Sequence, residues 1–216
     1  MAIQDRAIRT RRTIVAAAAK VFEENGYQAA TIMQILKEAG VTKGALYFHF
    51  KSKEDLARGV LAEQGQTAEL PARQIKAQQL VDLVMLHAHR LQTDPLVRAS
   101  VRLTLNSLEQ DLDRSGPFQE FGEICRSILT AAKEQGELLP HVDVAEASDV
   151  VVGSFGGMQA MSEALTGYQD LNLRAQSLVR YLLPSIVVPS VLAALVYDAD
   201  RGSRVHEEMT APQSEP

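Results

Sequence analysis

The stretch from Thr31 to Phe50, TIMQILKEAGVTKGALYFHF, constrains the fold more than any other part of the sequence. Its first apolar residues, between Ile32 and Leu36, follow the i, i+3, i+4 spacing that predicts a short helix with one apolar face. Gly40 is placed to end this helix, because glycine adopts the left-handed conformation of a helix C-terminus at little steric cost. Thr42 can then cap a second helix. Two short helices joined by a tight turn predict a helix-turn-helix, whose second helix fits the major groove of DNA.

The residues at the start of this second helix suit contact with DNA. Lys43 can reach a guanine edge or a phosphate, and Gly44 lets the protein backbone approach closely. Tyr47 and His49 can donate hydrogen bonds to phosphate oxygens. A helix cannot bury five consecutive positions against one neighbour, so the aromatic run is divided between surface and core. The residues assigned to the core are Leu46, Phe48 and Phe50.

The same stretch carries a family resemblance. Gly40 to Phe50, followed by KSKEDL at residues 51–56, resembles the DNA-binding signature of TetR-type repressors. The form VTKGALYFHF is similar to the branch of that family that binds γ-butyrolactone signals, or autoregulators, in actinomycetes. The resemblance runs from about Gln4 to about Leu195, which is nearly the whole chain.

The resemblance implies an all-α protein with an N-terminal three-helix DNA-binding domain that contains the helix-turn-helix. A C-terminal helical bundle would bind the ligand and form a homodimer. The implied function is that of a transcriptional repressor on an AT-rich inverted-repeat operator in double-stranded DNA. A γ-butyrolactone-type signalling molecule would release it and so control secondary-metabolite and antibiotic genes.

The charge of the chain is divided unevenly. Residues 1–60 carry 10 Lys and Arg against 6 Asp and Glu, a net charge of +4, whereas the other 156 residues carry 12 against 21, a net charge of −9. A basic first quarter on an acidic body is typical of a DNA-binding domain attached to a body that does not bind DNA. Ordinary scatter of surface charge is the alternative explanation for this tally.

Residues 4–25 are predicted to form the helix that precedes the motif, and Gly26 is placed to end it. Arg6, Arg9 and Thr10 are candidates for contact with the phosphates that flank the groove. The alternative for these three residues is a solvated helix face.

Two further caps bound the motif. Thr31 is placed to cap its first helix, with Gln34 as the partner in a capping box. Ser52 opens the next helix, and Lys53 lies at that helix start, where backbone amides and the positive helix end favour a phosphate. The residues predicted to contact DNA are Arg6, Arg9, Thr10, Thr31, Thr42, Lys43, Gly44, Tyr47, His49 and Lys53.

Pro71 breaks the helical pattern and is predicted to mark a domain boundary. From there to Leu195 the sequence has helical periodicity, without the alternation of a strand. The predicted helices cover residues 74–91, 95–106, 117–136 and 143–165. A segment from 171 to 195 follows, which must kink or divide at Pro184 and Pro189.

The residues after Arg201 are polar and are predicted to be a disordered tail. The predicted organisation is a helix-turn-helix domain over residues 1–52, a linking helix over 53–70, a regulatory ligand-binding and dimerisation domain over 71–200, and the tail over 201–216.

Segments 150–165 and 178–195 predict a dimer interface. The first is rich in glycine, which costs about 1 kcal/mol per residue relative to alanine inside a helix, so close approach of another helix or an adjacent cavity is expected. The second is apolar on more than one face. A twofold dimer would also carry two DNA-reading helices for a palindromic site. A central core helix in a monomer is the alternative.

The sequence predicts no enzyme, no cofactor and no metal site. His87 and His89 are two residues apart, on nearly opposite helix faces, so they are not a metal-binding pair. Cys125, the one cysteine, lies on an apolar stripe and reads as an inert core thiol. The run Gly153-Ser154-Phe155-Gly156 lacks the G-x-S-x-G spacing of a nucleophile elbow. The chain contains no apolar run of about 18 residues for a membrane span, and we expect a cytoplasmic protein.

The resemblance also implies a ligand pocket in the body. By position, Gln64 and Ser154 would hydrogen-bond a lactone or its hydroxyl, and Phe121 would stack beside it. Leu83, Met85 and Met158 would contact an apolar tail. Core packing is the alternative role for these residues, and for Gln64 a solvated side chain.

One departure from the branch affects the choice of ligand. Its receptors usually carry tryptophan where this chain has Phe121, and the chain contains no Trp. Phenylalanine keeps an aromatic face but lacks the indole N–H. A different lactone or butenolide therefore fits, as does a pseudo-receptor of the same fold that senses an antibiotic or another hydrophobic compound. A constitutive repressor without a ligand is a further alternative.

Overall fold

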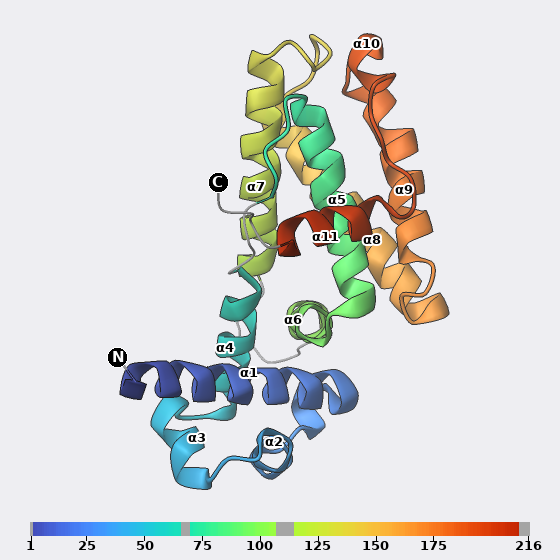
Figure 1. The fold of residues 1–216 in the computed structure, drawn as a ribbon. Coiled ribbons are helices and arrows are strands. Elements are labelled where there is room, and N and C mark those ends of the chain that lie inside the picture. Colours follow the sequence, from blue (N-terminus) through green and yellow to red (C-terminus); the bar gives the residue numbers. More distant parts are fainter. Residues whose placement is uncertain (1, 66–69, 107–114, 212–216) are drawn as a thin grey trace. The chain divides into compact units, whose positions relative to one another are not determined.

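The computed structural model describes residues 2–65, 70–106 and 115–211 of the chain (Figure 1). In these residues the regular structure is helical, apart from one isolated antiparallel bridge between Leu138 and Val187, so the all-α prediction is confirmed. The helices are α1 (Ala2–Ala29), α2 (Ile32–Ala39), α3 (Lys43–His49), α4 (Lys53–Gly65), α5 (Lys76–Thr93), α6 (Pro95–Asn106), α7 (Ser115–Glu134), α8 (Val144–Thr166), α9 (Leu171–Leu182), the 3-10 turn η1 (Leu183–Ser185), α10 (Pro189–Leu192) and α11 (Arg201–Thr210).

The chain folds into two compact units. The first contains residues 1–67 and 94–117, and the second contains residues 68–93 and 118–216. Helices α1 to α4 and α6 therefore belong to the first unit, while α5, most of α7 and the helices after it belong to the second.

The first unit is built around α1, which packs against α2, α4 and α6. The apolar stripe of α1 is buried as its helical spacing predicts, with Ile14, Ala18 and Phe22 in the core of the unit. Gly26 has a φ of 73° and a ψ of 160°, so the helical conformation breaks there before the last residues of α1. Glycine tolerates this positive φ, which explains why the helix turns at that position.

The helix-turn-helix forms as its local sequence predicts. Thr31 caps α2 in a complete capping box: its hydroxyl accepts from the amide of Gln34, whose side chain accepts from the amide of Thr31. Gly40 ends α2 in the left-handed conformation with a φ of 63°. Thr42 caps α3 by accepting from the amide of Ala45 at 3.3 Å.

The two units differ from the predicted domains. The sequence places residues 95–106 in the regulatory domain, but α6 belongs to the first unit, where Leu103 joins the core. Helix α4, predicted as a separate linker over residues 53–70, belongs to the same core through Val60. Residues 66–69 of that prediction lie outside the described residues. Helical periodicity identifies an apolar face but not the helix that will cover it, which is why these assignments differ.

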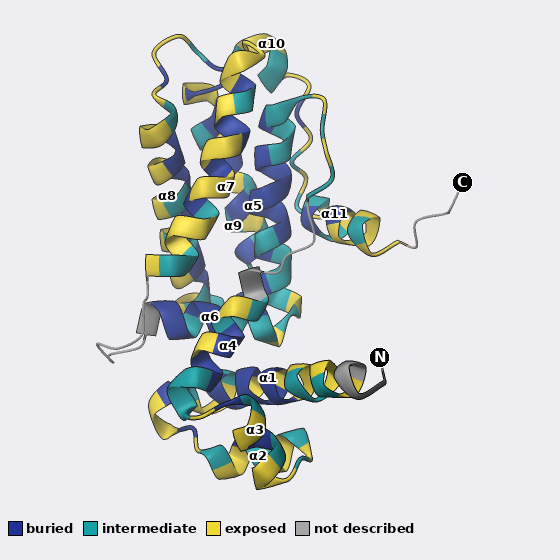
Figure 2. Cartoon of the chain, turned by 90° about the vertical axis from the view of Figure 1, so that its left-hand side faces the viewer, coloured by how far each residue is buried: buried dark blue, intermediate teal, exposed yellow. Residues whose placement is uncertain are grey.

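In the second unit, α9 and α11 pack against α5, and α8 packs against α9. Most residues of α5 are buried, and it is largely dark blue in Figure 2. The last apolar segment divides at its prolines as predicted: α9 ends at Leu182, Pro184 lies in η1 and Pro189 begins α10.

The predicted disordered tail is wrong for residues 201–210, which form α11. Arg201 donates two hydrogen bonds of 2.7 Å to the carboxylate of Asp82, a fully buried residue of α5. Arg73 donates to the same carboxylate at 2.6 Å and pairs with Glu208 of α11. A polar sequence gives no sign of this contact, because the charge that α11 needs lies more than a hundred residues earlier. Residues 212–216 lie outside the described residues.

Candidate functional site

The exposed face of α3 is the candidate DNA-reading surface. Leu46 and Phe50 are buried in the core of the first unit and hold one side of the helix. Lys43, Gly44 and Tyr47 are exposed. At Gly44, no described heavy atom lies within 4 Å of the position that a Cβ would take. Helix α3 therefore presents a cation, an unobstructed stretch of backbone and a phenol to solvent.

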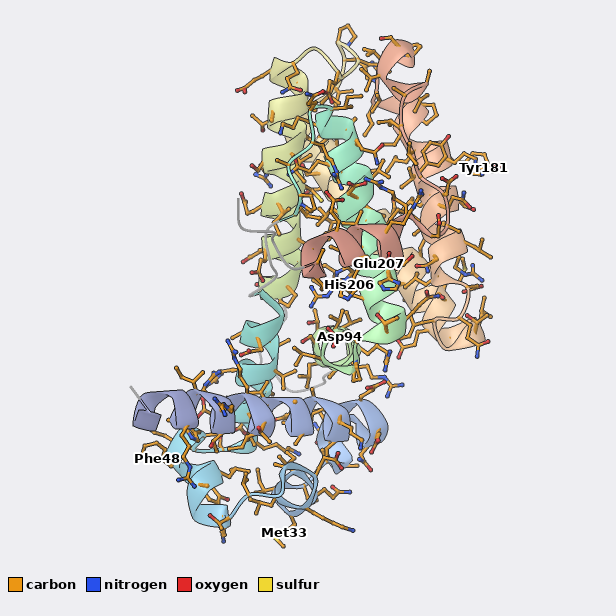
Figure 3. All side chains as sticks on the ribbon, in the orientation of Figure 1. Met33, Phe48, Asp94, Tyr181, His206 and Glu207 are labelled. Carbon is orange, nitrogen blue, oxygen red and sulfur yellow. The ribbon has the colours of Figure 1, made fainter. Side chains whose placement is uncertain are left out.

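Phe48 does not lie in the core, as the sequence predicted, but is 80% exposed. Leu46 and Phe50 are four residues apart and share a helix face, whereas Phe48 is rotated from each of them by about 200°. The half-buried ring of His49 packs 5.0 Å from the ring of Phe48. Figure 3 labels Phe48 on α3 and Met33 on α2, both at the edge of the unit. A phenylalanine in this place can contact a thymine methyl group, a role that the sequence reading missed.

Lys43 and Tyr47 are neighbours on the exposed face, with the Lys43 Nζ atom 5.8 Å from the centre of the Tyr47 ring. The spacing of four residues brings both side chains to one side of the helix. Thr42 and Thr31 are also exposed, but their hydroxyl oxygens accept backbone amide hydrogens as helix caps. The hydroxyl of Thr31 additionally donates to the Gln34 side chain at 2.9 Å, so this hydroxyl is already occupied.

The side chain of Lys53 has a structural role. Its Nζ atom donates to the carbonyls of Tyr27, Gln28 and Ala30 at 2.8, 3.2 and 3.1 Å. The same atom lies 4.5 Å from the centre of the Tyr27 ring. The side chain therefore closes the C-terminal end of α1 and is not free for a phosphate. Only the backbone amides at the start of α4 remain as the predicted phosphate contact.

The early basic residues of α1 fall into two groups. Arg6 and Arg9 are exposed, and within the described chain neither forms an ion pair. Thr10 is half-buried and its hydroxyl donates to the Arg6 carbonyl at 2.9 Å. By contrast, Arg11 and Arg12 lie 3.4 and 3.7 Å from the carboxylate of Glu63. The two unpaired arginines are therefore the ones available to phosphate.

In the second unit, three rings from three helices meet. The ring centre of His87 on α5 lies 5.3 Å from that of Phe121 on α7 and 5.4 Å from that of Phe155 on α8. The two phenylalanine rings are stacked with their centres 6.1 Å apart. Phe121 was predicted at the ligand site, whereas His87 and Phe155 were not. The sequence feature that could have identified His87 is its place on the apolar helix face that also carries Leu83 and Leu91.

Two glycines lie where α7 and α8 meet beside these rings. A Cβ on Gly156 of α8 would lie 3.8 Å from the ring of Phe118 on α7. Reciprocally, a Cβ on Gly122 of α7 would lie 3.9 Å from a methyl group of Val152 on α8. Both distances are those of ordinary van der Waals contact, so close helix approach within this chain does not require glycine at either position.

The other predicted ligand residues are divided by the structure. Leu83 lies one turn before His87 and so falls near the aromatic cluster, whereas Met158, two residues after Gly156, lies about 200° around α8 from the side that meets α7. Ser154 lies two residues before Gly156, and therefore about 200° around α8 from the side that meets α7. Met85 lies on the face of α5 that packs against α11, as its carbonyl contact with Gly202 shows. The side chain of Gln64 lies outside the described residues.

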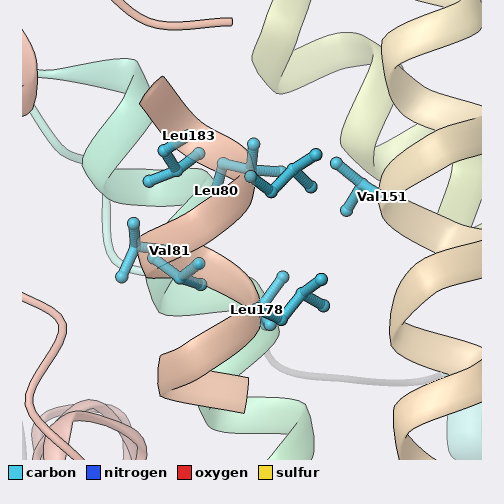
Figure 4. A pocket seen from close by; sticks show the side chains of 8 residues that line it. Leu80, Val81, Val151, Leu178 and Leu183 are labelled. Carbon is cyan, nitrogen blue, oxygen red and sulfur yellow. The ribbon is translucent and has the colours of Figure 1, made fainter. Parts of the chain in front are cut away.

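A small apolar cavity lies elsewhere in the second unit (Figure 4). Its volume is about 10 Å³, which is room for no more than one water molecule. None of the six predicted ligand residues lines it. The lining residues come from α5, α8, α9 and η1: Leu80, Val81, Val84, Val151, Leu178, Val179, Leu182 and Leu183.

These two units define a class of protein. One unit presents α3, the second helix of a helix-turn-helix, to solvent. Lys43 on α3 and Arg6 and Arg9 on α1 are its exposed cations without an ion pair in the described chain. The other is a separate helical unit with ring side chains gathered between three of its helices. This combination is that of a DNA-binding regulator with a distinct helical regulatory domain.

The comparisons with known proteins identify the family. Residues 14–60 match the bacterial regulatory proteins of the tetR family, and residues 77–189 match the tetracyclin repressor-like C-terminal domain. The chain belongs to the TetR family of bacterial regulators.

Three individual proteins agree with this assignment. The A-factor receptor protein of Streptomyces griseus is 39% identical over 193 residues, which are 89% of this chain and 69% of that protein. The TetR regulator TylP of Streptomyces fradiae is 46% identical, with a TM-score of 0.87 over 95% of this chain and 99% of that one. A structure described as a gamma-butyrolactone receptor (ArpA-like protein) is 31% identical, with a TM-score of 0.68 over 94% and 98% of the two chains.

Among the helices that the structure describes, none is long and apolar enough to cross a membrane. The same residues contain no group of three or more His, Cys, Asp or Glu side chains that could hold a metal ion. Burial raises the pKa of the Cys125 thiol to about 12, which keeps it in the unreactive protonated form.

Proposed function

We propose that this protein is a homodimeric, cytoplasmic transcriptional repressor that binds an AT-rich inverted-repeat operator and is released by a γ-butyrolactone-type or butenolide signal. Its targets would be secondary-metabolite and antibiotic genes. The observation that carries the DNA-binding part is the open face of α3, where Lys43 and Tyr47 are exposed and nothing obstructs Gly44.

The geometry of α3 supports entry into the major groove. A groove about 12 Å wide admits a helix, and a lysine at the helix start can reach a guanine edge or a phosphate. Arg6 and Arg9, which lack ion pairs in the described chain, would add sequence-independent phosphate contacts. Their contribution should weaken as salt is raised.

A dimer through α8 and α9 is supported by large apolar residues that stay exposed in the described chain. Along α8, Val150, Met161 and Leu165 are exposed on one stripe, and Leu165 is 66% exposed. The same stripe contains Gly153 and Gly157, where a Cβ would meet no heavy atom within 4 Å. Glycine in a helix interior is unfavourable unless another helix approaches closely, and here that helix would come from a second copy.

Helix α9 also carries exposed apolar side chains. Leu173 and Tyr181 are eight residues apart and so share a helix face, and Tyr181 is 80% exposed (Figure 3). A twofold dimer through α8 and α9 would supply two α3 helices for the two halves of an inverted repeat. Large exposed apolar groups that gather on one face are typical of an interface.

Ligand release is supported by relatives described as an A-factor receptor and a gamma-butyrolactone receptor, and by the ring cluster around Phe121. Drug-sized ligands need about 300 Å³ or more, so the apolar cavity of about 10 Å³ could take one only after it had widened. The ligand would weaken operator binding only if it prefers a conformation with lower DNA affinity.

A constitutive repressor is the second candidate, and it is consistent with an apolar cavity of about 10 Å³ that is too small for a lactone. A pseudo-receptor that senses an antibiotic is supported by the phenylalanine at position 121. A gel-shift titration separates the three functions. Purified protein is bound to the inverted repeat upstream of its own gene and challenged with γ-butyrolactones, butenolides and antibiotics.

Each result of this titration selects one function. Release by a lactone or butenolide supports the signal receptor, and release by an antibiotic alone supports the pseudo-receptor. Tight binding with no release supports the constitutive repressor. Absence of binding at low salt would contradict the repressor function itself.

A further inference from the structure

His87 is a polar side chain among aromatic ones. Its ring meets that of Phe155 almost edge to face, at an interplanar angle of 73°, and that of Phe121 at 51°. Within the described part of the chain, neither of its nitrogens forms a hydrogen bond. A half-buried imidazole without a hydrogen-bond partner in the described chain has both ring nitrogens available to another molecule.

The imidazole is neutral and partly accessible. Its side chain retains accessible surface and is only half-buried by area. Burial nevertheless lowers its pKa to about 4, and the positive charge of Arg90 on the next turn adds to this effect. His87 is therefore neutral at physiological pH.

A neutral imidazole offers one N–H donor and one nitrogen acceptor. A carbonyl oxygen can accept from the N–H, and a hydroxyl can donate to the other nitrogen. The two phenylalanine faces beside it suit a flat, uncharged ring. A neutral ring offers a carboxylate no opposite charge, and the two phenylalanines would cost it hydration, so this chemistry favours a neutral oxygen-bearing ring compound.

We infer that His87 is the polar anchor of the ligand site, holding a neutral ring with a carbonyl or hydroxyl group beside Phe121 and Phe155. This inference rests on the proposed function, since it names the residue that would recognise the signal. It also reassigns a role: Ser154, the expected hydrogen-bonding partner, lies around α8 from the side that meets α7, whereas His87 touches Phe121 directly.

Two substitutions at position 87 separate the effect of hydrogen bonding from the effect of side-chain volume. His87→Leu keeps a comparable volume but has neither donor nor acceptor, whereas His87→Gln keeps both. His89→Leu is the matched control, because His89 lies on the opposite face of α5, with its ring 5.4 Å from that of His206 on α11. Circular dichroism and operator affinity without ligand show whether each variant is folded.

The probes are a γ-butyrolactone with an alkanoyl chain, a hydroxylated γ-butyrolactone and a butenolide. Binding to the full-length protein is measured by calorimetry, and release by gel shift. We expect His87→Leu to weaken both by about tenfold or more, as for a lost hydrogen bond to a buried polar group. His87→Gln should stay within about threefold of the wild type, and His89→Leu should match it.

Unchanged binding in His87→Leu overturns the inference, and so does equal weakening in His89→Leu. If a probe binds the wild type without releasing DNA, the release function fails while the calorimetric comparison still decides the role of His87. If no probe binds the wild type, both the ligand function and the inference are overturned.

Discussion

Gly202→Ala tests whether α11 is held on α5 by a close backbone contact. A Cβ at this position would overlap the carbonyl oxygen of Met85 and lie 2.8 Å from the Cβ of His89. Ordinary contact begins at 3.4 Å, so α11 must move by at least about 0.6 Å, the difference of these distances, to clear His89 alone. Because the obstructing oxygen belongs to the backbone, no side-chain rotation relieves the overlap.

The movement also acts on the ion pairs of Asp82. Arg201, next to Gly202, donates to this fully buried carboxylate at 2.7 Å through two nitrogens, and Arg73 supports it from another segment. Overpacking costs about 1–3 kcal/mol, and removing a partner from a buried charge costs about 3–5 kcal/mol. Since Arg73 remains paired, we expect the free energy of unfolding to fall by about 2–4 kcal/mol.

The measurement is urea unfolding followed by circular dichroism, together with hydrogen exchange of the α11 amides. Ser203→Ala is the control: it adds no atom and loses one hydrogen bond of 2.7 Å to the Asp200 carbonyl, so a change of about 1 kcal/mol or less is expected. Loss of exchange protection in α11 alone would mean that the helix detaches locally. Wild-type stability together with wild-type protection in Gly202→Ala would refute the close-contact argument.

Three other predictions follow from exposure and charge. Lys43→Ala should weaken operator binding and, where it contacts phosphate, reduce the slope of log affinity against log salt by about 1, as measured by gel shift; an unchanged affinity would remove Lys43 from the interface. Phe48→Ala should change the free energy of unfolding by less than about 0.5 kcal/mol, whereas Leu46→Ala should lower it by about 2–5 kcal/mol; equal effects in urea unfolding would contradict the reported faces of α3. Leu165→Asp should shift a dimer towards monomer in sedimentation, since it places a charge in the proposed interface, and persistence of the dimer would exclude this surface.

Local features of the fold could be predicted from the sequence because they depend on neighbouring residues. The capping box at Thr31, the left-handed turn at Gly40 and the breaks at Pro184 and Pro189 are each decided within a few residues. A cap needs only a side-chain oxygen near free amides, and a proline lacks the amide hydrogen that a helix requires. The helix-turn-helix was therefore readable before any tertiary contact was known.

The wrong prediction that Phe48 of α3 lies in the core also has a local cause. The apolar residues at 46, 48 and 50 alternate like those of a strand, and all three were assigned to the core. On a helix, this period sends the middle residue to the opposite face. The exposed position of Phe48 could have been inferred once the helix was accepted.

The second unit depends on contacts between distant segments. Helix α11 has a polar sequence, and only the buried carboxylate of Asp82 gives its arginine a partner. His87 was read as one half of a rejected metal pair, whereas its significance comes from Phe121 and Phe155 on two other helices. Periodicity tells which face of a helix is apolar, but the identity of the covering helix depends on how the whole chain packs. Caps, turns and breaks were thus determined by the sequence alone, while the partners of α6, α11 and His87 were decided by tertiary structure, because those contacts join residues that no local pattern connects.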